Sequence, residues 1–217
     1  MLRLEGDNPR GMSGAEPLVL DLWKEAARNG TIWIPDRVTN AWASAIRMAL
    51  YALRQVPSIE VIVDCSGGYE RSFDPCHELL WRWRRRRPRA KPYVLPENHK
   101  DPLDEGLDLE TTTTVLGHAH SIGLSYSVCA TKRLAVPDAK FAVHGGGDRW
   151  GEKIAVSARD IEGLVDEEDH FSADWLAGFT KQPYGFWLDI VSSKRVHEFG
   201  VAEALEWGVI DEVTEGV

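Results

Sequence analysis

Two residues of the types that act together in hydrolytic enzymes lie at comparable places in this sequence. Ser121 follows an apolar, threonine-rich run over residues 111–116 and stands where a small-residue stretch opens an expected helix. His144 ends another strand-like run, which begins at Lys140. A serine hydroxyl is a weak nucleophile until a base accepts its proton, and an imidazole is the usual base. The pair predicts two members of a hydrolytic triad, and the third has to be sought elsewhere.

Taken singly, each residue has a simpler interpretation. A serine at the start of a helix is most often an N-cap, and a histidine at a strand end is most often a hydrogen-bonded surface group. Two more histidines, His118 and His120, precede the serine. We expect them to line the pocket or to belong to the core, because no cysteine or carboxylate stands at metal-ligand spacing beside them.

The elements expected around the pair follow the rhythm of an α/β fold. Short β-branched or apolar runs predict strands, and apolar residues at helical spacing predict helices. The expected strands cover residues 31–34, 60–65, 111–116, 133–136 and 140–144. The expected helices cover residues 18–28, 40 to near 57, from about 74, 121–130, 153–179 and 186–192, and a turn lies at Ser66-Gly67-Gly68.

Composition limits the class of protein. A chain of 217 residues, 43% hydrophobic, suits one compact domain, and a net charge of −9 makes it a poor general ligand for nucleic acid. Three cysteines without paired spacing, no signal core and no apolar run of membrane length predict a reduced, cytoplasmic protein. We expect a flexible lead over residues 1–16 and a single domain over 17–217. An insertion at about 84–110 carries four arginines, which we expect at a helix end.

Five segments in order resemble motifs of the Clp protease proteolytic subunit (ClpP) family, in the wider ClpP/crotonase superfamily, over about residues 31–213. They are the strand at 31–34 with its following helix, Asp64-Cys65-Ser66-Gly67-Gly68, Gly117-His118-Ala119-His120-Ser121-Ile122-Gly123, the stretch from Arg133 through Pro137 to His144, and Glu203-Ala204-Leu205-Glu206-Trp207-Gly208-Val209-Ile210-Asp211. In the family the second is a Ser-Pro-Gly-Gly turn and the third a Gly-x-Ala-x-Ser-x-Gly nucleophile motif. The chain resembles a divergent member.

The resemblance implies a ClpP/crotonase-type α/β fold of repeated strand-strand-helix units with a protruding handle helix. It also implies a serine peptidase that uses no cofactor and no metal. Ser121 would be the nucleophile, and His144 would be the base that later protonates the leaving amine. The main-chain N–H groups of Gly68 and Ile122 would form the oxyanion hole.

The acid of the family's triad has no counterpart at its expected place. Counting back from Glu203-Ala204, that place is Val196, whose side chain cannot accept a hydrogen bond. Other candidates for the acid's role are His197, Glu198, Asp189 and Asp148. Three versions stay open: a peptidase with a substituted acid, a slow Ser–His dyad, and an inactive scaffold subunit.

By the same resemblance we expect a homo-oligomeric ring, a heptamer or two stacked heptamers, acting on polypeptide substrates. Its expected partner is an AAA+ unfoldase or a sister ClpP subunit. We expect it to bind neither nucleic acid nor a membrane. The handle is expected between residues 154 and 179, with Trp175 and Phe179 exposed for an interface or packed on their own domain.

Two other activities also stay open. A crotonase-type acyl-CoA enzyme shares the fold but requires no Ser–His pair, so the presence of Ser121 and His144 argues against it. A Ser–Lys dyad with Lys132 or Lys140 fits poorly, because it resembles the arrangement of signal-peptide peptidases and this chain shows no membrane segment.

Overall fold

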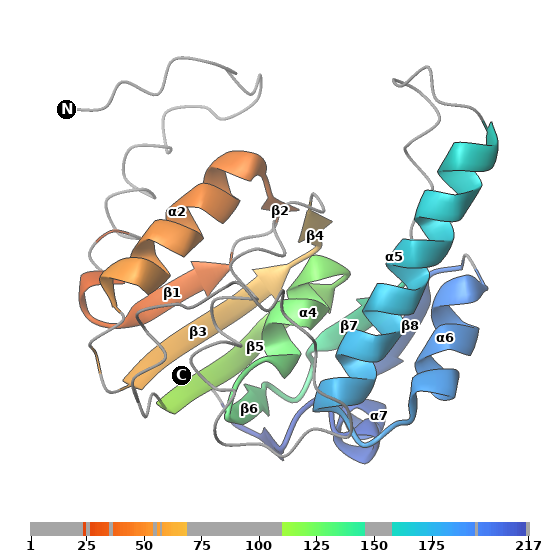
Figure 1. Cartoon of the computed structure of the whole chain (residues 1–217). Helices are drawn as coiled ribbons and strands as arrows, with labels where there is room; N and C mark the ends of the chain where they lie inside the picture. Colours follow the sequence, from red (N-terminus) through yellow and green to blue (C-terminus); the bar gives the residue numbers. More distant parts are fainter. Residues whose placement is uncertain are drawn as a thin grey trace.

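The computed structural model describes residues 24, 27–34, 37–53, 56, 58–68, 110–145, 158–193 and 195–215. Over these residues the chain is mixed α/β, with a seven-stranded, mostly parallel sheet, a separate pair of short strands and five helices (Figure 1). None of the described helices is long and apolar enough to cross a membrane. The expected lead at 1–16, the helix from about 74 and residues 84–109 of the expected insertion at 84–110 lie outside the described residues, whereas Glu110 begins a strand.

The described strands are β1 (Thr31–Ile34), β2 (Arg37–Val38), β3 (Ser58–Cys65), β4 (Gly67–Gly68), β5 (Glu110–His120), β6 (Lys132–Ala135), β7 (Lys140–Val143), β8 (His197–Gly200) and β9 (Glu212–Val213). β5 organises the sheet, with β3 and then β1 parallel on one side of it. On its other side β5 pairs first with β6 and then, nearer its C-terminal end, with β7. β9 extends β6 in parallel, and β8 runs antiparallel to β7. β2 and β4 pair with each other.

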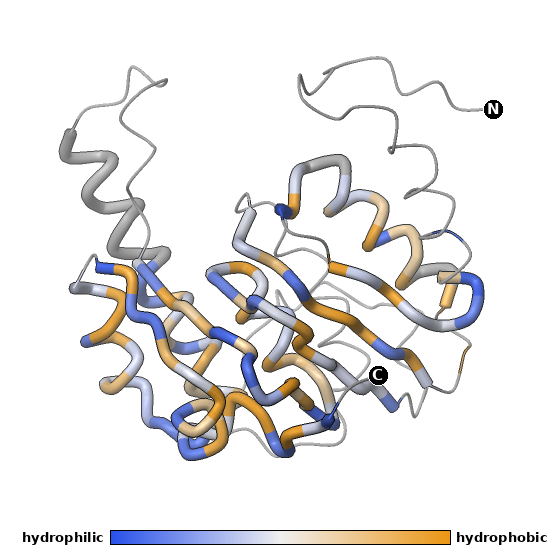
Figure 2. The backbone as a smooth tube through the Cα atoms, turned by 180° about the vertical axis from the view of Figure 1, so that it is seen from behind, coloured by the Kyte–Doolittle hydropathy of each residue, from blue (hydrophilic) through white to orange (hydrophobic). Residues whose placement is uncertain are grey.

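Burial explains why the central strands could be predicted. Val61, Ile62 and Val63 of β3 are all buried, as expected for a parallel strand that is covered on both faces. Figure 2 shows apolar residues concentrated along the central strands. β5, expected to end at residue 116, continues to His120, because its last three residues pair with β7.

The described helices are α2 (Asn40–Ala52), α4 (Ile122–Val128), α5 (Ala158–Phe179), α6 (Tyr184–Ser192) and α7 (Val201–Trp207). α4 is buried along its whole length, because it packs against β3 and β5 on one side and contacts α5 on the other. It is shorter than the expected helix over 121–130. α5 and α6 lie side by side, and the N-terminal part of α5 extends past α6 (Figure 1).

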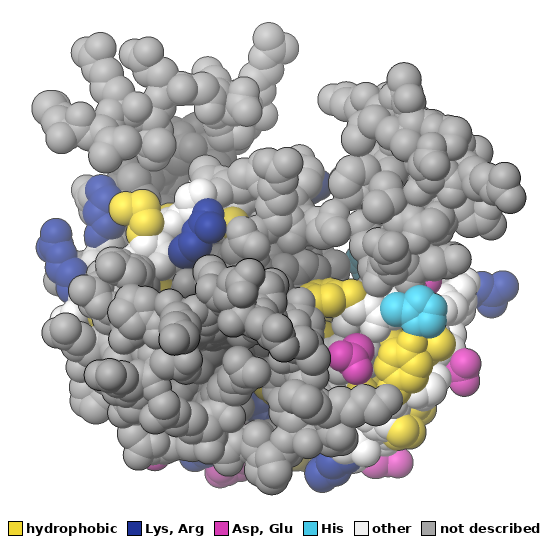
Figure 3. All heavy atoms as spheres, in the orientation of Figure 1, with side chains coloured by type: hydrophobic (Ala, Val, Ile, Leu, Met, Phe, Trp, Pro, Cys, Tyr) yellow, Lys and Arg dark blue, Asp and Glu magenta, His cyan; other side chains and the backbone are white. Residues whose placement is uncertain are grey.

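The aromatic stripe of α5 packs on its own domain. Trp175 is 6% exposed, and its ring contacts those of Phe171 and Phe179. Of the two alternatives for this stripe, the structure shows packing on its own domain, with Trp175 buried and Phe179 half-buried where α5 lies against α6. On the outside, the ring of His170 stacks on that of Tyr184 and hydrogen-bonds to its hydroxyl. Figure 3 shows a histidine beside hydrophobic side chains over α5 and α6.

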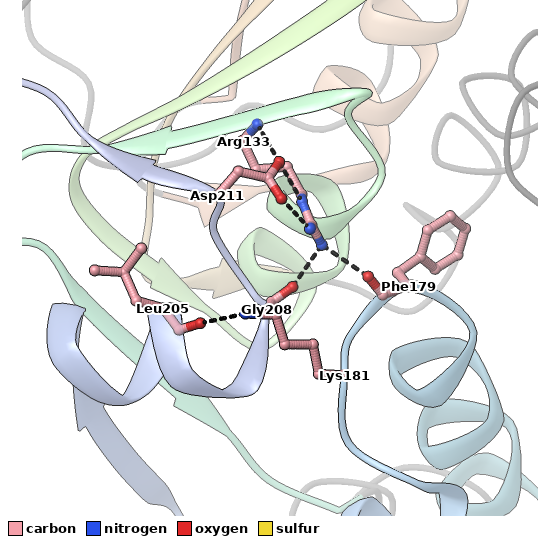
Figure 4. A network of polar contacts seen from close by, with 6 residues as sticks. All are labelled: Arg133, Phe179, Lys181, Leu205, Gly208 and Asp211. Carbon is pink, nitrogen blue, oxygen red and sulfur yellow. Dashed lines mark hydrogen bonds and ion pairs between the residues drawn. The ribbon is translucent and has the colours of Figure 1, made fainter.

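A buried arginine ties the ends of two helices to the sheet (Figure 4). Arg133 of β6 is 4% exposed, and its guanidinium forms a two-pronged pair with the carboxylate of Asp211, at 3.0 and 2.5 Å. Its Nη1 also donates to the carbonyl oxygens of Phe179 and Gly208, at 2.7 and 2.6 Å. These acceptors lie at the C-terminal ends of α5 and α7, so one side chain fixes both helices relative to β6.

Candidate active site

Ser121 occupies a strained turn between β5 and α4. Of the non-glycine residues that the structure describes, only Ser121 has a positive φ, with φ 53 and ψ −116. Its N–H donates to the carbonyl oxygen of Ala142 at 2.8 Å, which continues the β5–β7 pairing by one residue. Its side chain makes no capping hydrogen bond to α4. Ser121 is therefore not a side-chain N-cap, and a serine in a strained strand-to-helix turn is the arrangement that presents a nucleophile in other hydrolases.

His144 lies at the same edge of the sheet. It follows the last residue of β7, which runs parallel to β5 with His120 opposite Ala142. Continuing that register brings Ser121 and His144 to neighbouring strand ends. The His144 side chain is exposed, and its Nδ1 lies 2.9 Å from the carbonyl oxygen of Gly145. Among the described residues, no hydrogen bond joins the Ser121 hydroxyl to the His144 ring.

Gly67 and Gly68, which were expected in a turn, form the short strand β4, and this strand lies against the serine. A Cβ added at Gly67 would stand 3.5 Å from the Cβ of Ser121, and one added at Gly68 would stand 3.1 Å from Cγ2 of Ile122. Gly68 also approaches β2 so closely that a Cβ would lie 2.4 Å from the carbonyl oxygen of Val38. The main chain of Gly68 therefore lies close to the Ile122 side chain, and that of Gly67 lies close to Ser121.

Asp64, to which the sequence patterns assigned no role, stabilises the segment of β5 that precedes Ser121. Between the pairs Val63–Val115 and Cys65–Ala119, the single residue Asp64 lies opposite the three residues 116–118 of β5. The Asp64 carboxylate accepts the N–H of His118 at 3.0 Å and lies 3.4 Å from its Nδ1. Asp64 therefore stabilises the bulge in β5. The position of Asp64 in the sequence, at the start of the segment that ends in Gly67-Gly68, is the signal that could have indicated this role.

His120 adds a second imidazole beside the pair. In the described part of the chain its Nε2 is buried without a hydrogen-bond partner. Burial lowers the pKa of His120 from its ordinary value of 6.5, the neighbouring His118 and His144 lower it further, and Glu198 raises it. We therefore expect His120 to be neutral at pH 7. Within the described stretches, no group of three or more His, Cys, Asp or Glu residues is arranged to hold a metal ion.

The position expected for the acid lies beside His144. β8 pairs antiparallel with β7, with His197 opposite Val143 and Glu198 opposite Ala142. The next step of this register places Val196 opposite His144, and Val196 is 62% exposed. No carboxylate of the described residues hydrogen-bonds to His144.

Among the described residues, none of the other candidates for the acid's role hydrogen-bonds to His144, whose ring nitrogen Nδ1 contacts Gly145. The ring of His197 stacks on Trp207, with centroids 5.7 Å apart, on the buried side of the sheet. Glu198 interacts with His120. Asp189 is exposed on α6, and Asp148 lies outside the described residues.

The two lysines of the alternative Ser–Lys dyad are placed differently from His144. Lys132 pairs with Thr112, near the opposite end of β5 from Ser121, and its Nζ lies 3.4 Å from the Glu212 carboxylate. Lys140 lies opposite His118, three positions before Ser121 along β5. None of Lys132, Lys140 and His144 hydrogen-bonds to Ser121 in the described part of the chain, and the β5–β7 register places His144 nearer to Ser121 than either lysine.

Comparison with known proteins finds one distant relationship over about half of the chain. No family model matches the chain. The chain is 32% identical over 109 residues to the ATP-dependent Clp protease proteolytic subunit 2 of Cutibacterium acnes. The match covers 48% of this chain and 49% of that relative, so the chain spans about half the length of the curated relative it matches. The match supports a distant ClpP-like relationship.

Proposed function

We propose that this chain is a serine peptidase subunit of ClpP type that hydrolyses polypeptides, with Ser121 as the nucleophile and His144 as the base. The observation that carries the proposal is the main chain of Ser121, which has φ 53, makes no capping hydrogen bond and lies against Gly67 of β4. A serine that only capped α4 would have extended backbone angles and would bond to an N–H of the first helical turn. The distant likeness to a Clp proteolytic subunit supports the same activity.

The chemistry assigns one role to each group. Nε2 of His144 accepts the hydroxyl proton as Oγ of Ser121 attacks the carbonyl carbon of the substrate. The N–H groups of Gly68 and Ile122 donate to the oxyanion, and each such donor contributes about 3 kcal/mol to transition-state stabilisation. The imidazolium then protonates the leaving amine. The acyl-enzyme is hydrolysed by a water molecule that the same imidazole activates.

For this reaction a hydrogen bond has to form between the Ser121 hydroxyl and Nε2 of His144. Catalytic hydrogen bonds often become short only in the complex with substrate.

We also propose that the chain works in an assembly. The name of the relative in Cutibacterium acnes describes a proteolytic subunit of an ATP-dependent protease. By that likeness the expected assembly is a ring, a heptamer or two stacked heptamers, and the expected partner is an AAA+ unfoldase. Native mass spectrometry of the purified chain tests the ring, and a monomer at micromolar concentration would contradict it.

Peptide turnover tests the activity. A panel of N-terminally blocked fluorogenic peptides is incubated with the purified chain and with the Ser121→Ala and His144→Gln variants. We expect hydrolysis by the parent chain and loss of it in both variants, because each removes a group needed for acyl transfer. Hydrolysis that survives in Ser121→Ala would assign the activity to another residue or to a contaminant.

A second function is favoured by one observation, the valine at the acid's position. An exposed Val196 opposite His144 suits a catalytically inactive ClpP-like subunit that serves as scaffold in a mixed ring with a sister subunit. This alternative expects no hydrolysis by the chain alone and co-purification with the sister subunit. Turnover by the pure chain that depends on Ser121 would exclude it.

A further inference from the structure

We propose that the main-chain carbonyl of Gly145 orients the His144 ring in place of the acid that the triad lacks. It does so by holding His144 in the tautomer that a general base requires. This inference rests on the proposed function for its catalytic meaning, while its structural content concerns His144 and Gly145 alone. It makes Gly145 a positioning residue and assigns no catalytic role to Val196.

The contact between the two residues determines which ring nitrogen carries the proton. Nδ1 of His144 lies 2.9 Å from the carbonyl oxygen of Gly145, and a carbonyl oxygen can only accept. Nδ1 therefore carries the proton and donates it. The lone pair is left on Nε2, the nitrogen that has to accept a proton from Ser121. In a Ser-His-Asp triad the aspartate fixes this same tautomer.

The carbonyl can do this because its residue is held in place by two helices. Gly145 is buried, and a Cβ added to it would lie 2.0 Å from the carbonyl oxygen of Val191 on α6. The same Cβ would lie 2.7 Å from Oδ1 of Asp169, which is 2% exposed on α5. Any side chain at position 145 would push the segment away from α5 and α6. The glycine thus permits the close approach that sets the direction of its carbonyl.

The difference in charge between a carbonyl and a carboxylate determines which functions of the acid Gly145 can replace. A carboxylate both orients the imidazole and stabilises the imidazolium that forms during reaction, whereas a carbonyl offers only a dipole and a weaker hydrogen bond. Position 196 lies opposite His144 in the β7–β8 register, so a carboxylate placed there can take over the orienting role. Val196→Asp should therefore restore the orientation of His144 in a variant whose Gly145 carbonyl has been displaced.

The first measurement concerns the unmodified chain and does not depend on activity. Nitrogen-15 NMR of the ¹⁵N-histidine-labelled full chain distinguishes the two neutral tautomers, and His144→Gln assigns the signal. We expect the Nδ1–H tautomer, although free histidine favours Nε2–H. A predominant Nε2–H tautomer for His144 would overturn the proposal, whatever the variants do.

The second measurement compares rates of Ser121 labelling by a fluorophosphonate. Gly145→Ala is expected to move His144 towards the Nε2–H tautomer and to slow labelling about 10²-fold, the loss that a small misplacement of a reacting group causes. Adding Val196→Asp to Gly145→Ala is expected to restore most of that rate. Gly185→Ala on α6 is the matched control, because a Cβ there meets no atom within 4 Å. A folded Gly145→Ala variant that labels at the parent rate would overturn the proposal.

The two proposals fail separately. If the parent chain shows the Nδ1–H tautomer but Ser121 is not labelled, the peptidase proposal is wrong and the orientation of His144 by Gly145 stands. If Ser121 is labelled while His144 is in the Nε2–H form, the peptidase proposal stands and the role of Gly145 is refuted. A Gly145→Ala variant that does not fold leaves the decision to the NMR of the parent chain.

Discussion

Ser121 is expected to destabilise the fold through its main chain, and replacing it with glycine should relieve the strain. Its angles, φ 53 and ψ −116, bring Cβ into conflict with the backbone in an L-residue. Glycine is achiral, so its energy at these angles equals its energy at φ −53 and ψ 116, close to the broad extended region. The strain therefore belongs to the side chain and disappears when Cβ is removed.

The expected size of the effect follows from two opposing contributions. A residue held in such a region costs about 1–3 kcal/mol. Glycine costs about 0.5–1 kcal/mol in additional entropy of the unfolded chain. The hydroxyl makes no capping hydrogen bond, so Ser121→Gly and Ser121→Ala lose the same polar group and differ only in Cβ. The glycine variant should be more stable than the alanine variant by about 1 kcal/mol, or about 2–4 °C in Tm.

Calorimetric melting of both variants at one protein concentration measures this difference. Ser193 at the end of α6 supplies the control, because its φ −65 and ψ −16 are helical and its side chain is exposed. There the order should reverse, with alanine more stable than glycine. An alanine variant at position 121 that melts at or above the glycine variant would refute the strain.

Three further predictions concern other parts of the fold and site. Arg133→Met should cost about 3 kcal/mol of unfolding free energy, because it removes the guanidinium donors to the Asp211 carboxylate and to the carbonyl oxygens of Phe179 and Gly208, whereas Lys132→Ala on the same strand should cost under about 1 kcal/mol; equal urea midpoints would contradict this. Gly68→Ala should slow Ser121-dependent peptide hydrolysis about 10²–10³-fold in a folded protein, because the added Cβ displaces an oxyanion donor, and an unchanged kcat would rule out that role. Since burial lowers the pKa of His120 below 6.5, the unfolded chain takes up its proton first as pH falls, and stability is lost below about pH 6.5. His120→Gln should therefore lose less stability than the parent chain between about pH 7.5 and about pH 5.5 in urea titrations, and equal losses would contradict the assignment.

The parts of the fold that sequence patterns predicted are those in which local composition and burial agree. The apolar run of β3 and the threonine-rich first half of β5 have one plausible structure, a strand covered on both faces. The second half of β5 has the polar residues His118 and His120, and it is a strand because β7 pairs with it and Asp64 supports its bulge. Such support comes from residues far away in sequence, so no local pattern indicates it.

The exposure of the α5 side chains and the geometry of the site likewise depend on residues that are distant in sequence. Trp175 on α5 has a pattern that suits an interface or a core equally, and only the return of α6 decides that it is buried. The motifs predicted Ser121, His144, Gly68 and Ile122, and in the structure Gly67 lies against Ser121 and Gly68 against the Ile122 side chain. The contact of His144 with Gly145 could not be predicted, because every residue carries a main-chain carbonyl and only tertiary packing directs one of them at an imidazole.

The central claim is that Ser121 is an activated nucleophile, and mass spectrometry of the fluorophosphonate adduct tests it most directly. The purified chain is treated with the probe, and the modified peptide is mapped by fragmentation. We predict one adduct per chain, on Oγ of Ser121, with labelling lost in Ser121→Ala and strongly slowed in His144→Gln. No adduct on the folded parent chain, or an adduct of equal yield on Ser121→Ala, would contradict the account.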